Sequence, residues 1–212
     1  MSLEVIQVSP TTGETPKGLV VALHGWGANA EDLAGLVPFV NLPDYQFMFP
    51  NAPYPYPYSP TGRAWYELRS ENAYQGLVES RQLLHKWLSS LEGSTGIPLS
   101  RTVLVGFSQG AAMTMDVGLH LPLAGLVALS GYLHPIADMG QRDFNTCPPI
   151  LLVHGRQDAV VPIEAGENAK TTLETLGVRV NYHEFDMGHE IRPQVLPLIR
   201  NFVVEVTPTS EL

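Results

Sequence analysis

The stretch that decides the fold runs Val103-Leu104-Val105-Gly106-Phe107-Ser108-Gln109-Gly110-Ala111-Ala112. Its leading apolar residues are typical of a short buried strand. The G-x-S-x-G pattern that follows predicts a sharp turn from this strand into a helix, with the serine in the turn. Such a turn is crowded, so glycine two positions before and after the serine is a steric requirement. The alternative is an ordinary glycine-flanked helix start, which the preceding strand makes the weaker interpretation.

Short apolar runs and amphipathic stretches alternate along the rest of the chain. The runs are too short and too uniformly apolar for surface strands, which indicates buried parallel strands. They are Leu19–Leu23, Phe47–Phe49, Val103–Val105, Leu126–Leu129 and Ile150–Val153, with sheet-edge strands expected within Met1–Pro10 and Val178–Phe185. The expected helices are Glu71–Leu91, Gln109–His120, Glu164–Leu176 and Pro193–Val204. This alternation predicts an α/β fold with a mostly parallel, doubly wound sheet and helices on both faces.

The loops at the carboxyl ends of such strands form the ligand site. A serine hydroxyl needs a base to remove its proton, and the base needs an acid to orient it. On this scaffold the three follow in the order serine, acid, histidine. Asp158 directly follows the strand at 150–153, and His189 lies in a glycine-containing loop before the last helix. We therefore expect Ser108 to be a nucleophile, Asp158 its acid and His189 its base.

Other acidic residues and histidines compete for these roles. Asp158 could instead be the N-cap of the next helix. His134 precedes every plausible acid, and His154 is too close to Asp158 in the chain. The acids that do not directly follow a buried strand are Asp138, Asp143 and Asp186. The histidines on predicted helices or inside a strand are His85, His120 and His183.

A glycine-rich loop, His24-Gly25-Trp26-Gly27, follows the first buried strand. Attack of a serine on a carbonyl builds negative charge on oxygen, which two backbone N–H groups can stabilise. The Gln109 N–H begins a helix after the serine, and the glycines beside Trp26 bring bare backbone close. We expect these two N–H groups to form an oxyanion hole, and His24 to brace the loop by hydrogen bonding.

Five motifs occur in a fixed order along the chain. They are Leu23-His24-Gly25-Trp26-Gly27, Pro50-Asn51-Ala52-Pro53, Gly106-Phe107-Ser108-Gln109-Gly110, His154-Gly155-Arg156-Gln157-Asp158-Ala159-Val160-Val161-Pro162 and Gly188-His189-Glu190. Together, from about Leu19 to the C-terminus, they resemble the phospholipase/carboxylesterase branch of the α/β-hydrolases, which includes acyl-protein thioesterases and small carboxylesterases. The resemblance implies the α/β-hydrolase fold, a Ser108–Asp158–His189 triad and oxyanion donors at Trp26 and Gln109.

The sequence departs from this family beside the oxyanion loop. Trp26 stands where the family often has leucine, and Ala28 where it often has aspartate. The Pro/Tyr-rich segment at 53–60 and the segment that follows it lie in the part of the family chain that borders the substrate cleft. We hypothesise an aromatic wall that favours a small or flat acyl or aryl group; the alternative is a rigid surface loop. The substrate-pocket candidates are Trp26, Tyr56, Tyr58 and Trp65.

Composition bounds what else the chain can be. It has 212 residues, with 12 Lys and Arg against 21 Asp and Glu, and a net charge of −9. This length predicts a single domain over residues 1–212 without a separate lid domain. The acidic charge argues against nucleic acid as a partner and against charge-driven docking on anionic membranes. The single cysteine, Cys147, cannot form an intramolecular disulfide, and with no targeting segment we expect a cytoplasmic protein.

The expected activity is cleavage of carboxylic esters through an acyl-enzyme, with a small-molecule ester or an acylated substrate as partner. Hydrolysis of protein thioesters or of lysophospholipids by the same triad is the alternative within enzymes. From a different class, the chain could be a catalytically silent binding protein with a hydrolase fold. No metal or cofactor is expected, because metal-ligand and phosphate-loop motifs do not occur. The sequence leaves the oligomeric state open.

Overall fold

The computed structural model describes residues 3–69, 73–135 and 144–207. Within them, seven strands form one sheet in the order β1-β3-β2-β6-β7-β8-β9, and two more form a small hairpin, β4-β5. The strands of the sheet are β1 (Val5–Val8), β2 (Gly18–Leu23), β3 (Tyr45–Pro50), β6 (Thr102–Phe107), β7 (Gly125–Leu129), β8 (Ile150–Gly155) and β9 (Val180–Phe185). The hairpin pairs β4 (Tyr54–Pro55) with β5 (Arg63–Ala64). The predicted α/β fold with a mostly parallel sheet is confirmed.

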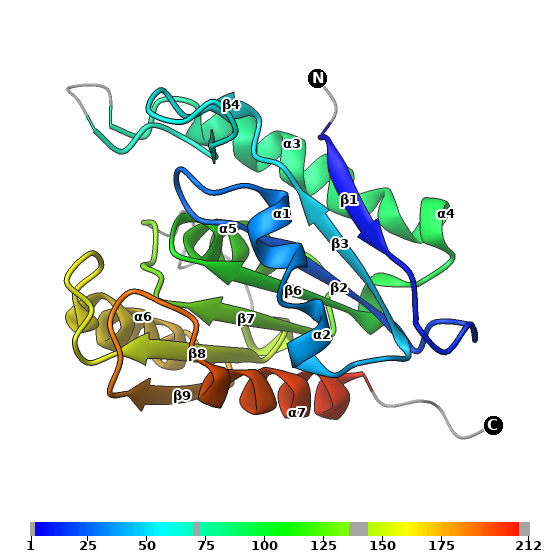
Figure 1. The fold of residues 1–212 in the computed structure, drawn as a ribbon. Helices are drawn as coiled ribbons and strands as arrows, with labels where there is room; N and C mark the ends of the chain where they lie inside the picture. The colour runs from blue at the N-terminus through cyan, green and yellow to red at the C-terminus, as the bar shows by residue number, and fades with distance from the viewer. Residues whose placement is uncertain (1–2, 70–72, 136–143, 208–212) are drawn as a thin grey trace.

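Helices cover both faces of the sheet (Figure 1). One face carries α1 (Ala30–Ala34), α2 (Val37–Val40) and α7 (Leu196–Val206). The other carries α3 (Leu77–Ser89), α4 (Leu91–Thr95), α5 (Gln109–Gly118) and α6 (Ile163–Thr175). Short 3₁₀ turns occur at Leu99–Arg101, Phe144–Thr146 and Pro193–Val195.

Side chains along each strand alternate between two hydrophobic cores, one on each face of the sheet. In β2, Leu19, Val21 and Leu23 pack toward α3 and α5, whereas Val20 and Ala22 pack toward the other helices. Every residue of β2, β7 and β8 is buried, as a parallel strand covered on both faces requires. The uniformly apolar runs in the sequence reflect this two-sided burial.

The strand order places the candidate loops at one edge. Of the seven described strands of this sheet, β1 alone runs antiparallel to its neighbour, β3, and the register aligns Leu23 of β2 with Gly106 of β6. The loops after β2, β6, β8 and β9 therefore leave the sheet at the same carboxyl edge, beside one another.

One helix begins later than the sequence indicates. The apolar spacing predicts a helix over Glu71–Leu91, but α3 starts at Leu77, and Glu71 lies outside the described residues. Gly76, just before α3, has φ +89°, a left-handed conformation that a helix cannot include. A Cβ there would also meet the Tyr54 ring at 2.5 Å. The apolar spacing begins before Gly76, but the helical conformation of the backbone begins only at Leu77.

Candidate active site

Ser108 lies in the turn between β6 and α5 with a strained backbone. Its φ and ψ are 56° and −118°, outside the regions usual for a non-glycine residue. A Cβ on Gly106 would lie 2.2 Å from the Gly110 carbonyl oxygen, and one on Gly110 would lie 2.2 Å from the Leu23 carbonyl oxygen. The steric requirement for both glycines is confirmed. The turn holds the serine at the carboxyl edge of the sheet.

His189 joins Ser108 to Asp158 by hydrogen bonds. The Nε2 atom of His189 is 2.9 Å from Ser108 Oγ, and its Nδ1 atom is 2.7 Å from Asp158 Oδ2. An ionised carboxylate can only accept, so Nδ1 carries the proton that it donates to Asp158 and Nε2 accepts from the serine hydroxyl. The Phe107 ring packs against the imidazole at 4.8 Å between ring centres. This geometry suits removal of the serine proton by His189.

Asp158 divides its two oxygens between two tasks. Oδ1 accepts hydrogen bonds from the Val160 and Val161 N–H groups, both at 2.9 Å, while Oδ2 faces His189. Burial opposes ionisation, but the hydrogen bonds from His189 and these two N–H groups outweigh it and lower the pKa of Asp158. The alternative N-cap role is wrong, because Pro162 is the N-cap of α6. Asp158 closes the turn before the helix.

The rival residues lie in other places. His154 is buried beside Asp158, with Nε2 3.6 Å from Oδ2, and its ring donates to the Val161 carbonyl at 2.9 Å. Asp186 is an exposed partner of Arg156. His85 is exposed on α3, His120 is exposed just beyond α5, and His183 lies in β9. Asp138 and Asp143 are outside the described residues.

The loop after β2 lies against the serine. A Cβ on Gly25 would approach Ser108 Cβ to 3.2 Å, so the Gly25–Trp26 backbone runs directly beside the nucleophile candidate. Within the described residues, the N–H groups of Trp26 and Gln109 have no hydrogen-bond acceptor. Gln109 is the first residue of α5, where the helix leaves N–H groups unpaired. Both groups are available to an anion.

His24 braces this loop as a neutral side chain. Its Nε2 atom accepts from the Ala52 N–H at 3.0 Å, so Nδ1 carries the proton and donates to the Gly25 carbonyl at 2.8 Å. Desolvation lowers the pKa of the imidazole to about 4, despite the favourable hydrogen bond to Gly25. One ring nitrogen binds Gly25 within this loop and the other binds Ala52 after β3, so His24 has no nitrogen left for proton transfer.

The aromatic segment packs beside Trp26. The Trp26 ring meets Tyr56 edge-on at 4.8 Å, Tyr56 meets Tyr58 at 5.4 Å, and the Arg69 guanidinium lies 4.9 Å over the Trp26 ring. A cavity of about 410 Å³ is bordered by Trp26 together with Tyr54, Pro57 and Glu79. Tyr58 is 71% exposed.

Trp65 is not a pocket residue. Its side chain has no solvent exposure, and its indole N–H donates to the His24 carbonyl at 3.0 Å. The expectation that it forms part of the aromatic wall is wrong, because its ring packs into the core between α3 and the end of β2.

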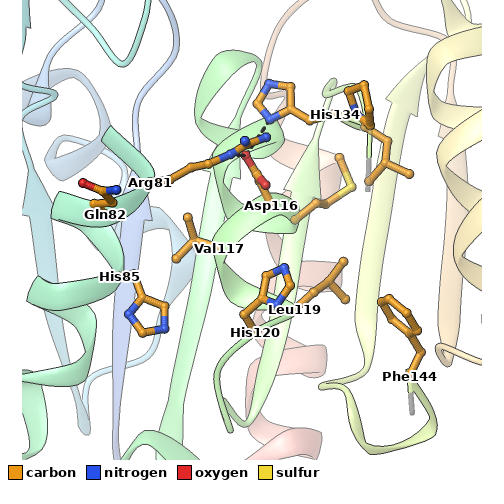
Figure 2. A pocket seen from close by; sticks show the side chains of 12 residues that line it. Arg81, Gln82, His85, Asp116, Val117, Leu119, His120, His134 and Phe144 are labelled. Atoms are coloured by element: carbon orange, nitrogen blue, oxygen red, sulfur yellow. Dashed lines mark hydrogen bonds and ion pairs between the residues drawn. The ribbon is translucent and has the colours of Figure 1, made fainter. Parts of the chain in front are cut away.

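A second aspartate–histidine pair, which the sequence did not reveal, lies on the α3–α5 face (Figure 2). His134 Nδ1 is 2.8 Å from Asp116 Oδ2, its Nε2 is 2.7 Å from the Tyr66 hydroxyl, and Arg81 also binds Asp116. Burial opposes the charge, but hydrogen bonds from His134 and Arg81 lower the pKa of Asp116. The group borders a cavity of about 540 Å³ between α3 and α5. No motif joins positions 66, 116 and 134.

The described residues hold neither a metal-binding cluster nor a membrane-spanning helix. In residues 3–69, 73–135 and 144–207, no cluster of three or more His, Cys, Asp or Glu side chains has the arrangement of a metal site. Over the same ranges, none of the helices has the length and apolar character needed to span a bilayer.

Comparisons with known proteins place the chain in a family and support the fold. A family model described as phospholipase/carboxylesterase matches residues 5–207. Acyl-protein thioesterase 1 of Neurospora crassa is 30% identical over 205 residues, which cover 87% of this chain and 82% of that protein. The crystal structure of esterase PE8 is 33% identical, with a TM-score of 0.85 and coverage of 97% of this chain and 100% of that one.

A more distant structure shows the same fold. The Bacillus cereus carboxylesterase has a TM-score of 0.80 at 17% identity, with 96% of this chain and 94% of that chain covered. The resemblance inferred from the five motifs is therefore confirmed over nearly the whole chain. The chain belongs to the phospholipase/carboxylesterase family of α/β-hydrolases, and it is a hydrolase of the esterase and thioesterase type.

Proposed function

We propose that the protein hydrolyses carboxylic esters through an acyl-enzyme on Ser108. The observation that carries this proposal is the hydrogen-bonded chain from Ser108 through His189 to Asp158. His189 takes the serine proton as Oγ attacks the carbonyl carbon, and Asp158 stabilises the imidazolium. The carbonyl oxygen, now negative, accepts from the Trp26 and Gln109 N–H groups.

The tetrahedral intermediate collapses when His189 gives its proton to the leaving alkoxide, so the alcohol departs and an acyl-Ser108 ester remains. A water molecule then loses a proton to His189 and attacks the same carbonyl carbon. Collapse of the second intermediate returns the proton to Ser108 and releases the carboxylic acid. The oxyanion hole serves both steps, because each passes through a negatively charged oxygen at the same place.

Removal of the nucleophile tests this proposal. Ser108→Ala should abolish turnover of p-nitrophenyl acetate and covalent labelling by a fluorophosphonate, with an unchanged circular dichroism spectrum. The matched control is Ser89→Ala at the exposed end of α3, which should retain both. Near-wild-type turnover by Ser108→Ala would overturn the proposal. Absence of labelling in the wild-type protein would favour the catalytically silent binding protein.

Acyl-protein thioesterase or lysophospholipase activity is the second candidate. The name of the Neurospora crassa relative favours the thioesterase, and the same triad suits all three reactions because each proceeds by acyl transfer. Turnover of an S-palmitoylated peptide and of lysophosphatidylcholine should be compared with that of p-nitrophenyl acetate and p-nitrophenyl palmitate. A higher kcat/KM for the palmitoylated peptide than for both p-nitrophenyl esters would identify a thioesterase.

We propose further that the sheet and its helices act as one domain, with selectivity set by short loops instead of a separate lid. The proposed catalytic and oxyanion residues lie in loops that leave one edge of one sheet, which supports a single domain. A cytoplasmic location is likewise a proposal, supported by the single cysteine, and fractionation of cells that express the tagged protein tests it.

A further inference from the structure

Residues 63–66 lie between the two loops that carry the proposed oxyanion donors. At one end, the Gly27 N–H donates to the Arg63 carbonyl and the Arg63 N–H donates to the Ala28 carbonyl, both at 2.8 Å. These two bonds attach the loop after β2 to β5. Two residues further on, Trp65 and Tyr66 reach the start of α5. One short segment therefore contacts both sides of the proposed hole.

The Gln109 side chain makes the contact with α5. Its Oε1 atom accepts from the Trp65 N–H at 2.9 Å, and its Nε2 atom donates to the Tyr66 carbonyl at 2.8 Å. The Gln109 side chain has no solvent exposure, so water cannot bind its amide. The amide and the backbone of residues 65–66 therefore satisfy each other's hydrogen bonds. Gln109 supplies one of the proposed donors with its backbone N–H. Its side-chain amide holds the same residue to the backbone of residues 65–66.

The Trp65 indole makes the contact with the loop after β2. Its Nε1–H donates to the His24 carbonyl at 3.0 Å, immediately before the Gly25–Trp26 peptide. The Trp65 carbonyl accepts in turn from the Ser80 hydroxyl of α3. The indole is fully buried, so it has one orientation and one acceptor.

The same loop fixes the direction of the Trp26 N–H. The Gly25 carbonyl accepts from His24 Nδ1 at 2.8 Å and from the Ala28 N–H at 3.2 Å. A trans peptide is planar, with its carbonyl and N–H on opposite sides, so a fixed Gly25 carbonyl directs the Trp26 N–H the other way. The position of this peptide depends on the His24 backbone, which Trp65 holds.

We propose that Trp65 and the Gln109 side chain are positioning residues that set the distance and direction between the two oxyanion N–H groups. This inference rests on the proposed function, because it needs an oxyanion to form beside Ser108. Trp65 binds no substrate in this role. It acts through the His24 carbonyl on one donor and through Gln109 on the other.

The test removes the indole N–H and keeps an aromatic ring in the core. Trp65→Phe should lower kcat for p-nitrophenyl acetate by about tenfold to a hundredfold, because small displacements of donors weaken transition-state stabilisation. KM should change little, since the donors act on charge that is absent from the bound substrate. The matched control is Trp87→Phe, a half-buried tryptophan of α3 in the same core, which should keep wild-type kcat.

A second readout separates positioning from loss of stability. An alkyl trifluoromethyl ketone adds to the serine as a hemiketal oxyanion, so its affinity should fall in Trp65→Phe by the same factor as kcat/KM. Fluorophosphonate titration counts the active sites and corrects for unfolded protein. Incorporation of benzothienylalanine at position 65, which keeps the ring size without the N–H, serves if the phenylalanine variant does not fold.

The outcomes distinguish the two proposals. Equal kcat in the Trp65 variant and the Trp87 variant, per titrated site, would overturn the positioning role and leave the esterase proposal intact. A wild-type protein that neither turns over esters nor reacts with the fluorophosphonate would overturn the proposed function first. A fall in kcat with unchanged ketone affinity would also count against Trp65 as a positioning residue.

Discussion

Burial acts in opposite ways on two polar side chains near Ser108. Desolvation lowers the pKa of His24 to about 4, which keeps the imidazole neutral and able to accept from Ala52. Asp158 is equally hidden, but its hydrogen bonds from His189, Val161 and Val160 outweigh desolvation and keep its carboxylate charged. Each group therefore holds the protonation state that its neighbours need at neutral pH.

Asp158→Asn should lower kcat by about 10⁴-fold without unfolding the protein, because an amide at this position favours the wrong imidazole tautomer. The measurement is steady-state hydrolysis of p-nitrophenyl acetate. Asp186→Asn is the matched control: this rival aspartate is 77% exposed and pairs with Arg156, so its replacement should leave kcat unchanged. A variant at 158 that is as active as the one at 186 would contradict the assignment.

His24 should make stability depend on pH between about 4 and 6.5. Below pH 6.5 the unfolded chain binds a proton on this histidine that the folded protein does not bind until about pH 4. The free energy of unfolding should therefore fall by about 3 kcal/mol across this range as the pH drops. Urea unfolding at pH 7 and pH 4.5 measures it. His24→Gln should flatten the pH dependence of the free energy of unfolding, whereas His85→Gln, at an exposed position, should leave it unchanged. The same pH dependence in both variants would count against the role of His24.

Trp26→Leu should shift acyl preference toward longer chains. The indole packs against Tyr56 and borders the 410 Å³ cavity, so a smaller side chain should admit more of an acyl group. We expect kcat/KM for p-nitrophenyl octanoate, relative to acetate, to rise about tenfold. Phe39→Leu, an exposed aromatic on α2, is the control. An unchanged chain-length profile in Trp26→Leu removes the idea of an aromatic wall.

At the scale of elements, glycines decide where helices begin and how closely they pack. Gly76 ends the turn before α3 with a left-handed φ of +89°, and the ring of Tyr54 occupies the space where a Cβ would lie. Gly93 of α4 is different, because no atom lies within 4 Å of a Cβ built on it. Hydrophobic spacing does not find this difference, since the predicted helix over Glu71–Leu91 includes Gly76 and ends before Gly93.

Gly76→Ala should lower the free energy of unfolding by about 1–3 kcal/mol. The backbone of an alanine is strained at this left-handed φ, and its methyl group would meet the Tyr54 ring at 2.5 Å. Gly93→Ala should instead raise it by about 0.5–1 kcal/mol, because alanine is the better helix former and the space is open. Urea denaturation of both variants checks the two signs. The same sign in both would show that the local conformation does not decide the effect.

At the scale of the whole molecule, one sheet gathers groups from distant parts of the chain. Ser108 and His189 are 81 positions apart, yet their side chains lie within hydrogen-bonding distance because β6 and β9 end at the same edge. The molecule also carries a net charge of −9, which acts on any charged surface that it approaches.

This charge predicts weak interaction with anionic lipid. Binding to phosphatidylserine vesicles should be no stronger than binding to phosphatidylcholine vesicles at low salt, because acidic surfaces repel one another. Co-sedimentation with both vesicle types measures it. Binding to the anionic vesicles that weakens as salt is added would contradict the prediction and would indicate a local basic patch.

Local sequence patterns are sufficient to predict the buried strands and the turn at Ser108. Two-sided burial makes a parallel strand uniformly apolar, and steric crowding restricts positions 106 and 110 to glycine, so both features are visible in adjacent residues. The order of Ser108, Asp158 and His189 along the chain was visible in the same way, and the structure brings these three side chains into one hydrogen-bonded chain.

Only the tertiary structure decided where Trp65 lies and what the Gln109 side chain binds. The sequence suggested a pocket wall for Trp65, whereas packing buries it against His24, and Gln109 reaches Trp65 across 44 positions. The group formed by Tyr66, Asp116 and His134 likewise has no signature in sequence spacing. Backbone sterics and periodicity act between neighbours and are encoded locally, but the partner of a buried polar group depends on how whole layers pack.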